Sequence, residues 1–254
     1  MNRAIGPLDV WACVISSGRW ANVLPVESLF GPCTWVVPEQ QAHEYKRSGA
    51  GRVLPVGSDY NVAHARNGAL DHAWHEGQGR SCLMLDDDPT GTIERVDPGY
   101  RKTKPISFPQ AIEILSMHRA MHRELRLFAF THMTNTFYVR NEFTLRTAIN
   151  GGCLLIDPTS LRFDVRFRTN SDVDYGLQHV AEYGGALRLN NIFMHFGRGN
   201  KHPDSGMGKY RTDELRTEMV ALLADKWPGW VKPAPDNPAH PVVRATGHRR
   251  AVLT

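Results

Sequence analysis

Leu83-Met84-Leu85-Asp86-Asp87-Asp88 is an apolar run that passes, without a spacer, into three consecutive carboxylates. Two ionised carboxylates about 4 Å apart repel each other by roughly 4 kcal/mol at an effective dielectric constant of about 20, so an ordered cluster needs a compensating charge. A divalent cation such as Mg²⁺ or Mn²⁺ supplies that charge with few protein ligands and keeps positions open for substrate phosphates. The alternative is an acidic turn, in which Asp88-Pro89 closes the turn and Asp87 is only solvated.

The segments before this run alternate short apolar stretches with helical patterns. Near-continuous apolar strands separated by helices are typical of a parallel sheet that is covered on both faces. The sequence therefore predicts a doubly wound α/β fold with a mixed, mostly parallel sheet flanked by helices. The predicted strands are 10–15, 34–37, 52–56 and 81–85, and the predicted helices are 21–30, 39–48 and 61–76.

Polar side chains follow these strands at their carboxyl ends, the edge where open α/β sheets bind ligands. Ser16, Ser17 and Arg19 follow the first strand, Glu39 follows the second, and the aspartate triplet follows the fourth. The first strand is not followed by Gly-x-Gly-x-x-Gly, which argues against a dinucleotide site. The chain also has no Gly-x-x-x-x-Gly-Lys-Ser/Thr segment, which argues against a P-loop.

The second half of the chain predicts a mixture of strands and helices. Strands are expected at 91–96, 106–108, 127–131, 153–156 and 186–196, and a helix is expected at 109–126. Residues 168–175 form a polar loop that leads into a further helix. Residues 197–208, with four glycines, have the composition of a mobile loop over a site. From Trp227 onward, five prolines and a basic end (Arg244, His248, Arg249, Arg250) predict an extended tail.

The composition limits the classes of function. The chain has 254 residues, of which 41% are hydrophobic and 22% charged, as in ordinary globular proteins. It has no apolar stretch of the roughly 18 residues that span a bilayer, and residues 1–9 lack the pattern of a signal peptide. These features favour one large domain over residues 1–226, followed by the tail at 227–254.

The cysteines and the net charge limit the possible classes of function further. Cys13, Cys33, Cys82 and Cys153 form no Cys-x-x-Cys pair, which argues against zinc-ribbon and thioredoxin sites and favours a reducing, cytoplasmic setting. The formal charge of +4 is compatible with a nucleotide or DNA as partner.

Three motifs in a fixed order carry a resemblance to a known family. Val14-Ile15-Ser16-Ser17-Gly18-Arg19 closes the first strand, and a helix with Ala65-Arg66-Asn67 precedes the strand that ends in the aspartate triplet. This order resembles the inverting glycosyltransferases of GT-A fold, in which an Ala-Arg-Asn-x-Ala-Leu helix precedes the strand with the Asp-x-Asp metal motif. The chain is most similar, over residues 10–208, to the phage TET-associated glycosyltransferases, a family predicted to put sugars on hydroxymethylated pyrimidines in DNA.

The resemblance implies a donor site. Asp86 would contact the ribose or the metal, and Asp88 would ligate Mn²⁺ or Mg²⁺ between the two phosphates of a nucleotide sugar, where the cation neutralises the leaving diphosphate. Arg66 would contact the nucleotide, because a planar guanidinium suits phosphate or base oxygens; a solvated helix arginine is the alternative. The other nucleotide-binding candidates are Ser16, Arg19, Glu39 and Asp87.

The resemblance also places an acidic pair, usually Glu-Asp, at the start of the helix after residue 170. One carboxylate of that pair takes the proton of the acceptor hydroxyl. This chain has Ser171-Asp172 instead, so the first acid is missing; Asp172 is the candidate base and Asp174 the second choice. The alternative is structural, since Ser171-x-x-Asp174 is typical of a capping box and both aspartates favour a helix N-terminus.

Histidines supply candidates for a further metal ligand. In this fold the ligand often follows the last strand, where His195 and His202 are available; a hydrogen-bonded structural role is the alternative for each. His118-x-x-x-His122 has helical ligand spacing, but Arg119 stands where a zinc protease carries its glutamate, which argues against a zinc hydrolase.

The sequence and the resemblance together predict a metal-dependent, inverting glycosyltransferase that uses a UDP-sugar and acts on hydroxymethylated phage DNA in the cytoplasm of the infected host. Its nucleotide-sugar half would cover about 9–96 and its acceptor half 97–226. Trp227 and Trp230 would stack on an extruded base, or are packing residues. The alternatives are a glycosyltransferase acting on saccharide or protein, a nucleotidyltransferase, and a DNA-binding protein with an inert acidic cluster.

Overall fold

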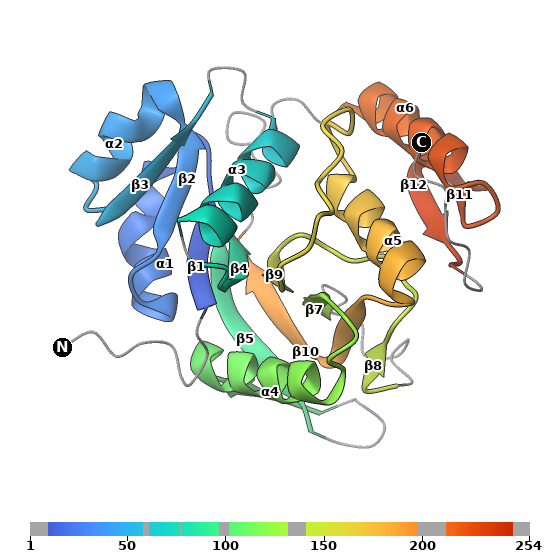
Figure 1. Ribbon diagram of the computed structural model, residues 1–254, viewed down its shortest axis with the longest axis horizontal. Coiled ribbons are helices and arrows are strands. Elements are labelled where there is room, and N and C mark those ends of the chain that lie inside the picture. Colours follow the sequence, from blue (N-terminus) through green and yellow to red (C-terminus); the bar gives the residue numbers. More distant parts are fainter. Residues whose placement is uncertain are drawn as a thin grey trace.

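The computed structural model describes residues 10–57, 61–76, 78–96, 102–131, 141–197 and 212–245. A ten-stranded sheet crosses the molecule in the order β3-β2-β1-β4-β9-β7-β10-β5-β6, and β8 pairs with β10 off this path (Figure 1). Its strands are β1 (Val10–Ile15), β2 (Thr34–Pro38), β3 (Arg52–Val56), β4 (Ser81–Asp86), β5 (Pro89–Arg95), β6 (Thr103–Ile106), β7 (Leu127–Thr131), β8 (Phe143–Thr144), β9 (Cys153–Ile156) and β10 (Leu187–Phe196).

Most of these strands run in one direction. β1 pairs in parallel with β2 and β4, β2 with β3, and β7 with β10. β9 is antiparallel to both β4 and β7, so β7 and β10 run the same way as the first four strands. β5 and β8 are antiparallel to β10, and β6 is antiparallel to β5. The predicted α/β fold with a mixed, mostly parallel sheet is confirmed.

Helices cover both faces of the sheet because its central strands are apolar on both sides. Cys13 and Ile15 of β1 belong to the core under α3 and α5, whereas Val14 between them belongs to the core under α1, α2 and α4. The helices are α1 (Val23–Phe30), α2 (Ala42–Arg47), α3 (Val62–His75), α4 (Phe108–Met121) and α5 (Ser171–Tyr183), with 3-10 turns η1 (Trp20–Asn22) and η2 (Glu39–Gln41) before α1 and α2. Among the helices described, none is long and apolar enough to cross a membrane.

Some boundaries differ from the prediction. The predicted strand at 106–108 ends at Ile106, because Ser107 caps α4 in a capping box with Gln110. The predicted capping box of α5 is absent: Ser171 is the first helical residue, and the N-cap Asn170 has a left-handed backbone (φ 62°) and no side-chain capping bond. Residues 198–208 of the predicted mobile loop, including His202, lie outside the described residues.

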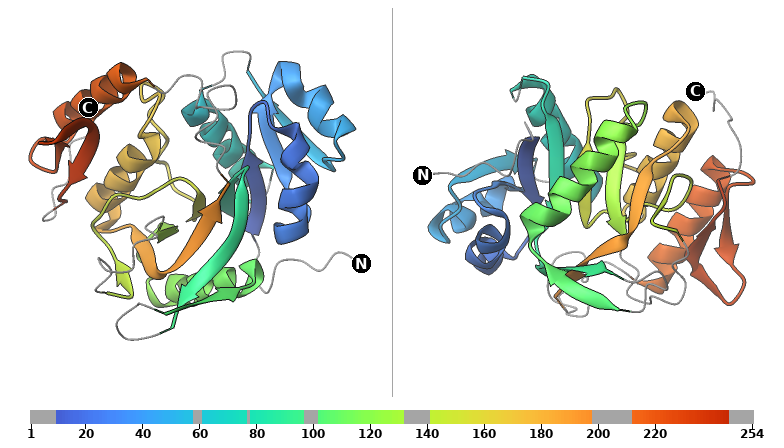
Figure 2. Two further views of the ribbon diagram at one scale, coloured as in Figure 1. Left: turned by 180° about the vertical axis from the view of Figure 1, so that it is seen from behind. Right: turned by 90° about the horizontal axis from the view of Figure 1, so that it is seen from below.

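The segment expected to be an extended tail folds into a hairpin. Helix α6 (Asp213–Lys226), which is not among the predicted elements, leads into β11 (Val231–Ala234) and β12 (Asn237–Val243), and the hairpin packs on α6. A two-stranded sheet has only edge strands, which tolerate proline. Figure 2 shows this unit at the opposite end of the molecule from α1 and α2. Trp227 and Trp230 are buried and stacked on each other, so the structure contradicts their role in base stacking.

His179 of α5 makes the stability of this core depend on pH. Its ring is fully buried, its Nδ1 bonds to the Tyr175 carbonyl oxygen at 3.0 Å, and its Nε2 has no hydrogen-bond partner within the described part of the chain. Burial lowers the pKa of His179 to about 4. In the unfolded chain the imidazole protonates near its usual pKa of about 6.5, so below that pH the unfolded state binds more protons than the folded state.

We expect this histidine to remove about 3 kcal/mol from the free energy of unfolding as the pH falls from 7 to 4, since each pKa unit corresponds to about 1.4 kcal/mol. The stabilisation is complete above pH 6.5 and is lost as the pH falls. His179→Leu should lose less stability over this range than the wild type, measured by urea unfolding at both pH values. His240→Leu, on the exposed side of β12, is the control and should behave like the wild type. Equal losses in the wild type and His179→Leu would contradict the prediction.

Candidate active site

The aspartate triplet lies at the edge of the sheet where β1, β4, β7 and β10 end, as expected from the parallel strands. Only Asp87 and Asp88 connect β4 to β5. The triplet therefore also forms a tight turn, as expected from the alternative of an acidic turn given above. The three carboxylates make different contacts, because neighbouring side chains at the end of a strand point to opposite faces.

Asp87 is buried and holds the loop that follows β1. Its Oδ2 accepts a hydrogen bond from Ser16 Oγ at 2.5 Å, and its Oδ1 forms an ion pair with Arg19 Nη1 at 2.7 Å. Ser16 Oγ also lies 2.5 Å from Tyr45 Oη, and Asn22 Nδ2 donates to the Asp87 carbonyl oxygen. Burial raises the pKa of Asp87, and Arg19 and Ser16 oppose that shift. Ser16 and Asp87, both expected at the nucleotide, therefore bond to each other.

Arg19 also compensates the charge of Asp88 beside a pocket. Its Nη1 lies 3.1 Å from Asp88 Oδ2. The pocket has a volume of about 410 Å³ and lies between the β1 loop with the start of α1 and the corner from β4 to β5. Arg19, Asn22 and Asp88 give it polar walls, and Pro25, Val26 and Pro89 are among its apolar lining residues.

Asp86 faces the opposite side of the edge and lies beside Arg66 of α3. The Arg66 side chain is almost fully buried, with Nη2 3.7 Å from Asp86 Oδ1, Nη1 3.4 Å from Ser171 Oγ, and the guanidinium carbon 5.3 Å from the Phe163 ring centroid. The Asp86 side chain keeps 40% of its surface exposed. Partial burial raises the pKa of Asp86 above its usual range; Arg66 lowers it in part, and the negative charges of Asp87, Asp88 and Asp172 raise it further.

Asp172, in the first turn of α5, lies near Asp86 and Arg66. Its Oδ2 accepts a hydrogen bond from the Gly151 N–H at 2.7 Å, its Oδ1 accepts one from Val173, and its charge acts on Asp86. Arg66, Asp86 and Asp172 come from α3, β4 and α5, and the structure brings them together at one edge. All three were candidate site residues from the sequence.

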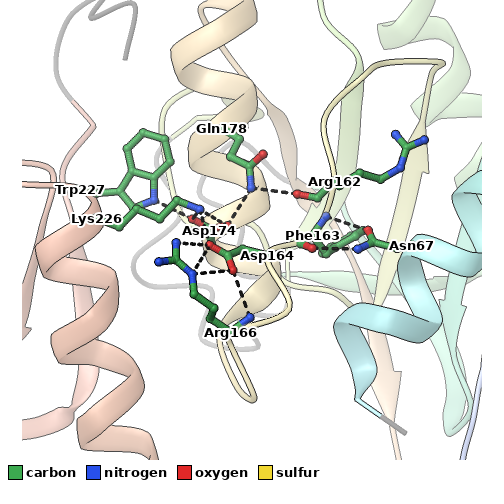
Figure 3. A network of polar contacts seen from close by, with 9 residues as sticks. All are labelled: Asn67, Arg162, Phe163, Asp164, Arg166, Asp174, Gln178, Lys226 and Trp227. Carbon is green, nitrogen blue, oxygen red and sulfur yellow. Dashed lines mark hydrogen bonds and ion pairs between the residues drawn. The ribbon is translucent and has the colours of Figure 1, made fainter. Parts of the chain in front are cut away.

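Asp174 has a different role from the catalytic one considered above. It is fully buried. Figure 3 shows its carboxylate pointing to Lys226 and Trp227 at the end of α6. Lys226 Nζ forms an ion pair with its Oδ1 at 2.9 Å, Trp227 Nε1 donates to the same oxygen at 2.8 Å, and Gln178 Nε2 donates to Oδ2 at 2.8 Å. A carboxylate with these partners and no exposed surface cannot take a proton from a substrate. Asp174 instead anchors the C-terminal unit to α5.

The remaining candidates lie apart from this group or outside the described chain. Glu39 is exposed in η2, and the residue of η2 that reaches the β1 loop is Gln41, whose Oε1 accepts a hydrogen bond from the Gly18 N–H at 2.7 Å. His195 pairs with Gly91 across β5 and has its ring 5.1 Å from that of Phe193. His202 is not among the described residues.

The charges of the triplet are compensated in part by arginines. Arg19 pairs with Asp87 and Asp88, and Arg66 lies beside Asp86, so two guanidinium groups face three carboxylates. No group of three or more His, Cys, Asp or Glu side chains could hold a metal ion within the ranges given above. A preformed metal cage does not fit these residues. An ion that enters with substrate phosphates needs only one or two protein carboxylates, and Asp88 at the pocket fits that requirement.

Two glycines that the sequence analysis did not single out contact Asp86 and Asp172. Gly151 bonds to Asp172, and the carbonyl oxygen of Gly152 accepts the N–H of Asp86 at 2.9 Å. The signal for them is the Asn150-Gly151-Gly152 segment directly before an apolar strand, which is typical of a turn with close backbone approach.

Two solved structures show distant likenesses to this chain. No protein-family model and no curated protein matches the sequence. Among solved structures, A197 from STIV is 10% identical over 95% of this chain and 96% of its own, with a TM-score of 0.39. Mannose-1-phosphate geranyltransferase from Thermus thermophilus is 14% identical over 85% of this chain and 64% of its own, with a TM-score of 0.33. Neither likeness assigns an activity to this chain.

Proposed function

We propose that this protein is a transferase that moves a sugar from a nucleotide-sugar donor to a hydroxyl acceptor. The observation that carries the proposal is the meeting of Arg66, Asp86 and Asp172 at the carboxyl edge of the sheet, where Asp88, two residues after Asp86, lines a pocket. A direct displacement needs a positive group for the leaving diphosphate and a base for the acceptor hydroxyl. The Arg66 guanidinium, beside the partly exposed Asp86, can be the first, and the Asp172 carboxylate can be the second.

Asp172 is the proposed base. Its two hydrogen bonds from Gly151 and Val173 are main-chain N–H bonds, which fix the carboxylate without a bound cation. Asp172 is partly exposed, unlike Asp174, so an acceptor hydroxyl can approach it. A displacement with this base needs no covalent enzyme intermediate and inverts the configuration of the sugar.

Arg66 and Asp88 are the proposed groups for the donor diphosphate. A guanidinium is a good partner for phosphate oxygens, and the shortest separation in the Arg66 to Asp86 pair is 3.7 Å, longer than an optimal charged hydrogen bond. Mn²⁺ or Mg²⁺ entering with the diphosphate would take Asp88 as protein ligand, and the bound ion would stabilise the negative charge of the leaving group. A uridine nucleotide and hydroxymethylated DNA are proposed as donor base and acceptor on the motif resemblance described above.

Ligand binding tests the donor site. Uridine diphosphate with Mn²⁺, at about 100 times its dissociation constant, should stabilise the wild type by about 2.7 kcal/mol, or roughly 5–10 °C in melting temperature for a chain of this size. Asp88→Asn should abolish the increase because it removes the anionic ligand. Asp236→Asn, an exposed aspartate in the hairpin turn, is the matched control and should keep the full increase.

The nucleotide that stabilises the protein separates the candidate functions. A shift with nucleoside triphosphates but not with diphosphates or nucleotide sugars would favour the nucleotidyltransferase alternative. The absence of a shift with every nucleotide tried, with and without Mn²⁺, would contradict the proposed donor site.

A further inference from the structure

The turn formed by Gly151 and Gly152 contacts Asp172 and Asp86 through its main chain and lies beside Arg66. The Gly151 N–H donates to Asp172 Oδ2 at 2.7 Å, and the Gly152 carbonyl oxygen accepts the N–H of Asp86 at 2.9 Å. Asn150 Oδ1 accepts the Gly152 N–H at 3.1 Å, which closes the turn locally. One turn therefore connects the end of β4 with the start of α5.

A side chain at either position would force a neighbouring side chain to move. A Cβ atom on Gly151 would overlap the Arg66 guanidinium, with Cζ only 2.7 Å away and Nη1 only 3.0 Å away. A Cβ atom on Gly152 would overlap the Phe196 ring, with Cε2 2.9 Å away. The guanidinium of Arg66 therefore lies directly against the bare backbone of Gly151.

This contact matters because the other contacts of Arg66 are weak. Its separations from Asp86 and Ser171 are 3.7 and 3.4 Å, both beyond the range of strong hydrogen bonds. Its Nε has no hydrogen-bond partner within the described part of the chain. The guanidinium is instead held by packing between the Phe163 ring and the Gly151 backbone. Its position thus depends on how closely that backbone approaches.

We propose that Gly151 is a positioning residue: its N–H orients Asp172, and its bare Cα sets the place of the Arg66 guanidinium, so one residue fixes the spacing between proton acceptor and cation. The inference rests on the proposed function for the roles of Asp172 and Arg66. It does not make Gly151 a catalytic residue, because Gly151 acts only through these two side chains.

A double-mutant cycle tests it. The reporter is release of uridine diphosphate from UDP-glucose with Mn²⁺ and hydroxymethylated DNA, and unfolding in urea is measured in parallel. Gly151→Ala should lower the turnover rate on the order of 10²-fold, the cost of a displacement of about 1 Å in a catalytic group. Arg66→Lys removes the planar fork that the new methyl group would strike, so adding Gly151→Ala to Arg66→Lys should lower the rate less than about 3-fold. Gly91→Ala, at the same edge with open space around it, should keep wild-type turnover.

Each outcome has one meaning. A large loss in the wild-type background and a small one in the Arg66→Lys background supports the positioning role. Equal losses in both backgrounds overturn it, even if the urea midpoints show that residues 151 and 66 are coupled, because Gly151 would then be merely structural. A wild type that releases no uridine diphosphate from any UDP-sugar, with hydroxymethylated DNA or with another hydroxyl acceptor, refutes the proposed function and with it the positioning role. In that case coupling of the urea midpoints still shows that the contact itself exists.

Discussion

Asp174→Ala is expected to lower the free energy of unfolding by about 3–5 kcal/mol, the usual cost of removing one partner of a buried ion pair. Asp174 has no exposed surface and receives bonds from Gln178, Lys226 and Trp227 (Figure 3). Its removal leaves the buried Trp227 Nε1 without an acceptor. Lys226 keeps a second partner, Asp164, at 2.9 Å, which places the expected loss toward the lower end of the range.

Chemical denaturation measures this loss, and amide exchange locates it. Because Lys226 ends α6 and Trp227 precedes β11, the amides of α6 and the hairpin should lose protection more than those of β1 or β4. Asp213→Ala is the control: this aspartate is on the same α6 unit, its side chain is 85% exposed, and its ion pair with Arg216 is worth at most about 1 kcal/mol. A loss below about 1 kcal/mol for Asp174→Ala would show that the network in Figure 3 does not hold the C-terminal unit.

The sheet could be predicted because most of its strands are marked by local sequence patterns. β1, β3, β7 and β9 have the predicted bounds, and each is a short apolar run between helical or turn segments. The capping of α4 by Ser107 and the existence of α6 were missed although local signals were present. Ser107 is followed three residues later by Gln110, and Thr212 caps a helix whose Met219, Val220 and Leu223 are buried.

The partners of the charged residues could not be predicted, because they are far apart in sequence. Arg19 meets Asp87 from 68 positions away, and Lys226 meets Asp174 from 52. The triplet does need a compensating charge, but no local pattern says that arginines provide it. For the same reason Asp174 stayed a second choice beside Asp172 in the sequence analysis. Residues two positions apart on a helix do not share a face, so one points to Gly151 and the other to α6.

This difference between the two aspartates gives the sharpest test of the proposed chemistry. Asp172→Asn keeps an oxygen that can accept the Gly151 N–H, so the turn and α5 should remain in place, but a carboxamide cannot take up a proton. We expect the turnover rate to fall by about 10²–10⁴-fold, the usual contribution of a general base. The stabilisation by uridine diphosphate and Mn²⁺ should be unchanged, because Asp172 contacts no part of the proposed diphosphate site.

Mass spectrometry of DNA incubated with UDP-glucose and Mn²⁺ measures the transfer itself. Hydroxymethylated DNA should gain the mass of one sugar per modified base with the wild type, and plain DNA should gain none; unchanged masses for both would remove DNA from the proposal. Glu182→Gln, an exposed acid on the same helix, should transfer at the wild-type rate. If Asp172→Asn kept more than about a tenth of that rate, well above the range for a lost general base, the proton would leave by another route and the role of Asp172 would reduce to holding Gly151.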